Sequence, residues 1–528
     1  MTQSTWKSDI GSGLLVFLIA LPLCLGISMA SGFPPTAGIL TAVIGGMLVS
    51  FLGSARLTIK GPAAGLIVIA LGAVTELGAG DNILGYKRAI AAVAVSGVIQ
   101  VMFALLKAGA VGDLMPSSVV HGMLAAIGVI IISKQTHVAL GVTPEGKEPL
   151  RLLAEIPHSI LNLNPEVFFI GLLSLLILFG LHQVKIKWVR MIPGPMLVLM
   201  AAVPLGLYFD LEHEHNYFLS THLFQIGPKF LIHLPGSSAS TIQFPDFSAI
   251  FSAVSIKYII MFALVGSIES LLSVSAVDSL DPEKRNSDMN KDLLATGIGN
   301  TLAGLLGGLP MISEIVRSKA NIDNGAKSHL SNFFHGTFLL LSLALIPGLL
   351  QKIPLAALAG MLIYTGFRLA SPKEFVHEYK IGAEQLFLFV TTMLVTLATD
   401  LLVGVGVGLI LQTALHIKSG ARIGTMFQAI VREERRTDEL VLHVHEAAIF
   451  TNYLGLKTRL ESIPDSVRTV VINFEKAWVV DHTVLQKLHG IERTWTNRRL
   501  ILTGLEEHVP MSSHELAARR KSRRTVAA

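Results

Sequence analysis

The chain contains few charged residues and a single cysteine. Only 15% of its 528 residues are Asp, Glu, Lys or Arg, whereas 51% are hydrophobic, and the mean hydropathy is +0.60. A soluble protein of this length is far less apolar, so the composition indicates a polytopic membrane protein. Because Cys24 is the only cysteine, the chain cannot form an intramolecular disulfide, and Cys24 is expected to be a buried apolar residue.

The chain also has no stripe of basic residues interleaved with aromatic ones. Its net charge is only +5, and aromatic residues make up 7% of the sequence. Nucleic acid is therefore not an expected partner.

Long apolar runs, by contrast, recur throughout the first four-fifths of the chain. The first run contains Pro22 and is followed at once by another, so it is expected to be a retained transmembrane helix rather than a signal peptide. Hydropathy predicts about fourteen spans, at residues 11–30, 36–53, 62–80, 88–106, 118–133, 167–183, 194–209, 248–275, 292–306, 310–324, 331–350, 354–370, 384–399 and 400–417.

The distribution of basic residues predicts the orientation in the membrane. Clusters such as Lys284, Arg285 and Lys291 would be cytoplasmic if the N-terminus is inside. The long connection from Tyr208 to Phe247 has one basic residue, Lys229, and would be outside. We therefore expect a multi-pass inner-membrane protein whose two termini are both cytoplasmic.

Two of these spans are interrupted by Gly and Pro. In GGLPMISEIVRSKANIDNG, Pro310 is interpreted as the start of a new helix inside the bilayer. In SARLTIKGPAAGLIVI, a short extended piece precedes Gly61 and Pro62, which are interpreted in the same way. Irregular backbone at membrane depth is tolerated only where it is buried in protein or lines a cavity.

The interrupted spans are the third of the first seven and the third of the second seven. Matching broken helices indicate an inverted-repeat transporter with a site near the midplane. Two facing helix N-termini would offer backbone N–H groups to a small anion. The alternative is that both are Gly/Pro kinks in ordinary helices.

Three motifs resemble the sulfate permease (SulP) family of anion transporters. They are ALPLCLGISMASG, AGILTAVIGGMLVSFLGSARLTIKGPAAG and GNTLAGLLGGLPMISEIVRSKANIDNGAKS. The resemblance implies an α-helical polytopic fold of seven plus seven inverted repeats, with core and gate domains and half-helices at spans 3 and 10. It also implies that substrate binds between the two half-helix N-termini, at Leu23, Lys60, Gly61, Ala63, Ala64, Pro310, Met311, Ile312, Ser313 and Glu314.

The chain departs from the family at three of these positions. Many sulfate-type members have Gln at the position of Leu23. The leucine here is similar to the residue of the bicarbonate-transporting branch. Small residues usually occupy the positions of Lys60 and Glu314. We expect these two charges to pair across the repeats; the alternative is a local pair of Glu314 with Arg317, a further cavity charge, while Lys60 reaches toward water.

The eighth span carries a carboxylate, Glu269, which is a functional candidate because a charge inside the bilayer is costly. Ser273 lies four residues further on the same helix face. The string ESLLS matches the place where the bicarbonate branch binds sodium. Carboxylate and hydroxyl oxygens suit Na⁺ as a coupling ion, and a protonatable Glu suits H⁺ equally well. No other cofactor is expected.

A second domain is predicted after the last span. Alternating strands and helices from residue 435 indicate a small α/β module, in which Asp481 caps a helix. The module is similar to the STAS domain that SulP proteins carry, which resembles anti-sigma-factor antagonists. His482 stands where those proteins have a phosphorylatable Ser, so that switch is not expected here, although the neighbouring Thr483 has a hydroxyl. We expect a transmembrane domain at 1–425, a dimer-supporting STAS domain at 435–510 and a basic, disordered tail at 511–528.

The predicted function is secondary active transport of a small oxyanion, bicarbonate or sulfate, coupled to Na⁺ or H⁺ through Glu269. The resemblance implies that the core moves against the gate, in an elevator-type mechanism. The chain would be a transporter and not an enzyme. The alternatives are an anion channel or exchanger of the same fold, a dicarboxylate transporter, or a membrane-anchored regulator that acts through the C-terminal module.

Overall fold

The computed structural model describes residues 3–107, 109, 115–146, 148–181, 192–219, 222–234, 242–435, 439–464, 467–495 and 498–521. The chain forms two compact units. Unit 1 comprises Met1–Gly109 and Ile127–Leu369, and unit 2 comprises Ala110–Ala126 and Ala370–Ala528. The units therefore do not follow the domain boundary expected at residue 425, because the last apolar helices belong to the same unit as the C-terminal module.

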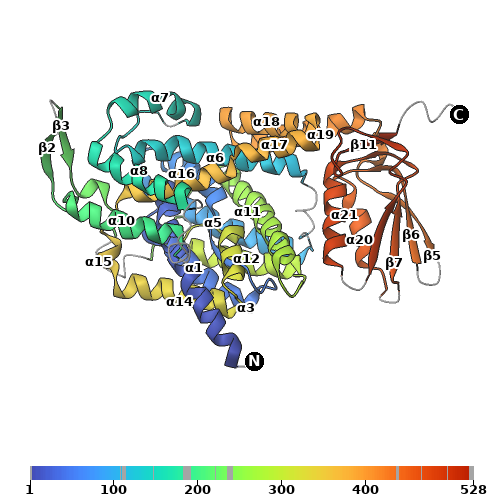
Figure 1. Cartoon of the computed structure of the whole chain (residues 1–528), viewed down its shortest axis with the longest axis horizontal. Coiled ribbons are helices and arrows are strands. Elements are labelled where there is room, and N and C mark those ends of the chain that lie inside the picture. The colour runs from blue at the N-terminus through green and yellow to red at the C-terminus, as the bar shows by residue number, and fades with distance from the viewer. Residues whose placement is uncertain are drawn as a thin grey trace. The chain divides into compact units, whose positions relative to one another are not determined.

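Unit 1 is almost entirely helical (Figure 1). Its first half contains α1 (Gln3–Ala30), α2 (Pro35–Ile44), the π-helical η1 (Gly45–Val49), α3 (Ser50–Leu52), η2 (Ala64–Leu66), α4 (Ile67–Gly78), α5 (Asn82–Leu105), most of α6 (Ser117–Ala139), α7 (Pro149–Leu161), α8 (Pro165–Gly180) and α10 (Gly194–Tyr208). Its second half contains η5 (Pro228–Phe230), α11 (Ala253–Leu280), α12 (Met289–Leu306), α13 (Ile315–Asp323), α14 (Leu330–Leu345), α15 (Pro347–Leu350) and α16 (Leu355–Leu369).

These helices agree closely with the predicted apolar runs. Among the described residues, seven helices are long and apolar enough to cross a membrane, and counting the bent pair α7–α8 as one span gives eight. Four shorter apolar helices of 10–17 residues accompany them. The count of fourteen spans and the inverted repeat remain predictions.

Small residues let the helices of unit 1 approach one another closely. Gly97 on α5 and Gly297 on α12 face each other, and a Cβ added at either would lie within 3 Å of the other's carbonyl oxygen. Close backbone approach of this kind is common where helices pack in membranes. A separate apolar cluster, built mainly from α1, α2, α8, α10 and α16, forms the main core of the unit.

Unit 2 combines apolar helices with the α/β module. It contains the first residues of α6, then α17 (Pro372–Ile381), α18 (Ala383–Ala398), α19 (Leu401–Lys418), η7 (Ile423–Thr425), α20 (Tyr453–Glu461) and α21 (His482–Thr494). Its strands are β5 (Ile430–Arg435), β6 (Glu439–Ala448), β7 (Thr469–Asn473), β8 (Ala477–Val480), β9 (Arg499–Thr503), β10 (His508–Pro510) and β11 (Arg519–Lys521).

These strands form one mixed sheet, in the order β10-β11-β8-β6-β7-β9, with β5 also paired to β6. Helices α20 and α21 pack on the sheet through one shared apolar cluster (Figure 1). The module begins with β5, ahead of the predicted start at residue 435.

The prediction of a disordered tail from residue 511 was wrong for its first part. Arg519–Lys521 form β11, which pairs with both β8 and β10. The run of basic residues hid this strand, because its backbone hydrogen bonds complete the ladder while its side chains stay partly or fully exposed. Residues 522–528 lie outside the described residues.

The polar connection after α10 also contains structure that hydropathy does not reveal. Strands β2 (His215–Leu219) and β3 (His222–Ile226) form an antiparallel hairpin. In the described part of the chain, no three His, Cys, Asp or Glu side chains come together as a metal site.

Candidate functional site

The two interrupted spans meet each other in unit 1. Strand β1 (Ile59–Pro62) pairs with β4 (Met311–Glu314) in antiparallel register. Ile59 stands opposite Glu314, and Lys60 opposite Ser313. All four residues of β1 are buried. The structure thus brings together two segments about 250 residues apart, as the sequence predicted.

The helices begin later than predicted. Pro310 is followed by the extended residues of β4, and α13 begins only at Ile315; likewise η2 and α4 follow Ala63 rather than Gly61. Ser313 is therefore in a strand and not in the first turn of a helix. The physical reason is the pairing itself, because the ladder satisfies backbone groups that two facing helix starts would leave without partners.

Lys60 does not pair with Glu314, so that prediction was wrong. The Lys60 side chain is only 2% exposed and forms an ion pair with Asp292 of α12, whose side chain is 1% exposed. The ammonium also donates to Ser313 Oγ at 2.7 Å and to Thr296 Oγ1 at 3.3 Å. The alternative, in which Lys60 reaches water, was wrong too, since a buried charge needs a buried partner.

Polar side chains from α11 and α12 hold β4 in place. Asn300 Oδ1 accepts from the Met311 N–H at 2.6 Å, and Asn300 Nδ2 donates to the Met311 carbonyl at 3.1 Å. Ser270 Oγ accepts from the Ser313 N–H at 3.2 Å. Sequence reasoning missed Asn300, Ser270 and Asp292, because the two strands that these side chains contact form only by pairing with each other, which no local pattern reveals.

Glu269 lies against the start of the first half-helix. The residue is 7% exposed, and its Oε1 atom has no hydrogen-bond partner among the described residues. A Cβ added at Gly65 would collide with the Glu269 carboxylate, which shows how closely it approaches η2. Ser273, the second predicted coupling residue, is 5% exposed one turn further along α11.

Glu314 and Arg317 complete the charged groups at this site. The Oε1 atom of Glu314 is buried and has no hydrogen-bond partner in the described part of the chain. Arg317 is 1% exposed and its Nη1 donates to Cys24 Sγ at 3.7 Å. The same Nη1 lies beside Gly61, where an added Cβ would be 2.6 Å away.

The remaining predicted site residues lie in or next to the two strands, apart from Leu23. The Ala63 N–H donates to the Pro310 carbonyl at 3.4 Å, so these two residues extend the strand pairing. Ile312 is buried in β4. Leu23 on α1 is partly buried and packs against the main apolar core of unit 1.

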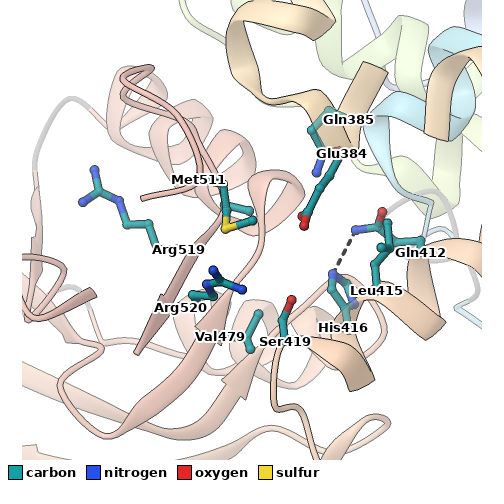
Figure 2. A pocket seen from close by; sticks show the side chains of 11 residues that line it. Glu384, Gln385, Gln412, Leu415, His416, Ser419, Val479, Met511, Arg519 and Arg520 are labelled. Carbon is teal, nitrogen blue, oxygen red and sulfur yellow. Dashed lines mark hydrogen bonds between the residues drawn. The ribbon is translucent and has the colours of Figure 1, made fainter. Parts of the chain in front are cut away.

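Unit 2 has a pocket of its own, which contains none of the predicted site residues (Figure 2). Gln412 and His416 of α19 contact each other at 2.8 Å on one side of it, and Arg520 lies on another. Nearby, Asp481 accepts from the backbone N–H groups of Val484 and Phe450, and so caps α21 as predicted.

The residue that replaces the phosphorylatable Ser is also buried. His482 Nδ1 contacts the Leu516 carbonyl at 2.8 Å, and Thr483 Oγ1 accepts from the Ser117 N–H at 3.3 Å. Both side chains belong to residues that are 2% exposed.

The apolar helices and the buried, charged crossing of β1 and β4 define the class of this protein, a helical membrane transporter. The comparison with protein families is more specific. Residues 6–392 match the sulfate permease family, and the chain belongs to that family. Its members are transporters and not enzymes, and the chain is accordingly an anion transporter of the membrane.

Several known relatives match most of the chain. The Bacillus subtilis protein YvdB, named as a candidate sulfate transporter, is 26% identical over 95% of this chain and 92% of its own. The bicarbonate transporter BicA of Picosynechococcus is 27% identical over 78% of this chain and 70% of its own.

Solved structures show the same fold. The transmembrane domain of a cyanobacterial BicA superposes with a TM-score of 0.65 at 24% identity, over 78% of this chain and 98% of that one. Murine SLC26A9 superposes with a TM-score of 0.68 at 14% identity, over 95% of this chain and 86% of that one.

Proposed function

We propose that this protein is a secondary active transporter of a small oxyanion, bicarbonate ahead of sulfate, coupled to Na⁺ or H⁺ through Glu269. The observation that carries the proposal is the position of Glu269, which lies against Gly65 at the start of a half-helix with one oxygen unpartnered among the described residues. A helix start offers N–H groups and a partial positive charge to an anion. A cation bound at the adjacent carboxylate would be bound together with that anion.

The names of the relatives support the substrate class. Relatives of this chain include a bicarbonate transporter and a protein named for sulfate transport. Both substrates are oxyanions that backbone N–H groups and hydroxyls can bind. The hydroxyl of Ser273 would supply a further oxygen if the coupling ion is Na⁺.

The crossing strands suggest how the site moves. Lys60, Asp292, Ser313 and Asn300 tie β1, β4 and α12 into one hydrogen-bonded group. Such a group would move as a rigid core against a gate, the elevator-type mechanism of two inverted seven-span repeats. The protein would be a homodimer in the inner membrane, with both termini cytoplasmic and the C-terminal α/β module acting as a STAS domain that supports the dimer.

Uptake into proteoliposomes tests this function. The purified protein is reconstituted, and radiolabelled bicarbonate and sulfate are supplied separately under an imposed Na⁺ gradient, an imposed pH gradient, or neither. We expect one anion to accumulate above its external concentration only with a cation gradient. Uptake that stops at equilibrium under every gradient would indicate a channel instead, and dependence on an opposing internal anion would indicate an exchanger.

A further inference from the structure

The ammonium group of Lys60 lies in a cage of oxygen atoms. It pairs with Asp292 Oδ2, and it donates to Ser313 Oγ at 2.7 Å and to Thr296 Oγ1 at 3.3 Å. A lysine ammonium has three N–H donors, so each donor has its own acceptor here. The three acceptors come from α12 and β4, and the residues that carry them are all buried.

The oxygen cage, formed by Asp292 Oδ2, Thr296 Oγ1 and Ser313 Oγ, also suits a metal cation. Hard cations prefer oxygen ligands such as carboxylates, and Na⁺ is a hard cation with a single charge. The one carboxylate of the cage matches that single charge. Without Lys60, Asp292 would be a buried charge with no cationic partner among the described residues. The cage is therefore a cation site that a side chain of the protein itself fills.

Hydrogen bonds connect the oxygen cage to the helix that carries Glu269. Ser270, the next residue of α11, accepts from the Ser313 N–H at 3.2 Å and donates through its hydroxyl to Ser313 Oγ at 3.5 Å. The Ser313 hydroxyl thus accepts from both Ser270 and Lys60. A hydroxyl oxygen has two lone pairs, so Ser313 Oγ has none left for a metal ion beside Glu269.

We propose that Lys60 is a built-in cation that takes the place of Na⁺ in this transporter, so that anion binding needs no Na⁺ and the coupling ion is H⁺. The ammonium is part of the chain, so it cannot dissociate and cannot itself couple transport to a gradient. Glu269 can still take up a proton, because a proton needs no set of oxygen ligands. This inference rests on the proposed function and decides between its two coupling ions.

The inference gives a reason for the lysine at a position where the family usually has a small residue. In this chain, a small side chain at position 60 would leave Asp292 without a cation and its oxygen cage open to one from solution. Replacement of Lys60 should therefore convert a protein that does not need Na⁺ into one that does.

Calorimetric titration of the purified full-length protein with sulfate tests the proposal. Sulfate is supplied as the choline salt in choline buffer or as the sodium salt in sodium buffer, at one pH. For the unchanged protein, we expect the two dissociation constants to agree within threefold, and a larger difference would overturn the proposal. Lys60→Ala should bind sulfate at least tenfold more weakly than the unchanged protein in choline buffer and regain at least tenfold in sodium buffer.

Thermal unfolding of the same proteins gives a readout that does not depend on transport. Na⁺ that binds the oxygen cage of the folded Lys60→Ala variant should raise its unfolding temperature in a saturable manner, because a ligand of the folded state stabilises that state. The unfolding temperature of the unchanged protein should not respond to Na⁺.

Three further variants sharpen the test. Lys60→Met is the matched control, because its apolar side chain fills the space without a charge, so Na⁺ should restore neither its affinity nor its stability. Lys60→Ser serves if the alanine variant fails to fold, and should show the same response to Na⁺. Lys291→Ala, a change at an exposed lysine, should behave like the unchanged protein in both buffers.

The outcomes separate this inference from the function on which it rests. If a Na⁺ gradient drives anion accumulation by the unchanged protein, or if Na⁺ restores neither affinity nor stability to Lys60→Ala, the built-in-cation proposal is overturned alone. If the unchanged protein accumulates neither bicarbonate nor sulfate under any gradient, the proposed function is overturned, and this inference with it.

Discussion

Lys60 and Asp292 show how a charge is tolerated inside this membrane protein. Both side chains are almost completely buried, and hydroxyls of Ser313 and Thr296 complete the hydrogen bonding of the ammonium. Such a pair is not by itself strong evidence of stability, but removal of one partner leaves an uncompensated buried charge. The pair therefore fixes β1 against α12 more than it contributes net free energy.

Asp292→Ala and Lys60→Ala should each lower the free energy of unfolding by about 3–5 kcal/mol, because each strands the opposite charge. The double variant should lose much less than the sum, since no charge is left unpaired. Chemical unfolding of the purified protein in detergent measures these values. The exposed pair of Arg151 and Glu155 is the control, where Arg151→Ala should have little effect. Additive losses for Lys60 and Asp292 would refute the pairing.

At the scale of elements, the sequence predicted which segments meet but not how they meet. The Gly/Pro interruptions at Gly61 and Pro310 indicated two broken spans, and the structure brings both together. It places strands where helix starts were expected, because the strands exist only through pairing with a partner far away in sequence. Propensity and hydropathy describe neighbours along the chain, so they cannot reveal that pairing.

The same limit explains which site residues were missed. Glu269 was identifiable because a carboxylate within an apolar run is unusual. Asp292 stands at the predicted edge of its span, where an acidic residue normally faces water. Its role depends on Lys60, which is 232 residues away along the chain.

A substitution at Gly65 tests whether transport needs the close contact between Glu269 and the start of the half-helix. Gly65→Ala would place a methyl group against the Glu269 carboxylate, so the carboxylate must move away from η2. We expect anion uptake to fall at least tenfold while the protein still folds. Gly11→Ala is the matched control, because a Cβ there meets nothing within 4 Å. Initial uptake rates in proteoliposomes measure both, and equal rates would show that the contact is not needed.

The cap of α21 gives a pH prediction for the C-terminal module. Burial raises the pKa of Asp481 from 3.8 to about 6. The folded state therefore favours the protonated form. The stability that this protonation of Asp481 adds to the folded state is fully present below about pH 4 and is lost as the pH rises through about 6.

Hydrogen exchange of the full-length protein checks this prediction. After correction for the intrinsic rate, the segments around Phe450 and Val484 should lose protection between pH 5 and 7. Asp481→Asn, which does not titrate, should remove this pH dependence. Protection that is flat across this range in the unchanged protein, or equally sloped in the variant, would contradict it.

At the scale of the whole molecule, the residues proposed for transport all lie in unit 1, whereas the α/β module lies in unit 2. Deletion of residues 430–528 should therefore weaken dimerisation or membrane expression more than the transport step. Size-exclusion chromatography and uptake per folded molecule measure the two effects. A well-expressed truncated protein that binds its anion but does not turn over would make the module part of the transport cycle.

Glu269 is the residue proposed to couple a cation to anion movement. The most direct measurement compares radiolabelled anion accumulation by the unchanged protein and by Glu269→Gln, under an imposed Na⁺ or pH gradient. We predict that the unchanged protein concentrates the anion and that the variant, folded and reconstituted equally well, does not. Accumulation by the variant to the same level, with the same dependence on the cation gradient, would contradict the coupling role of Glu269.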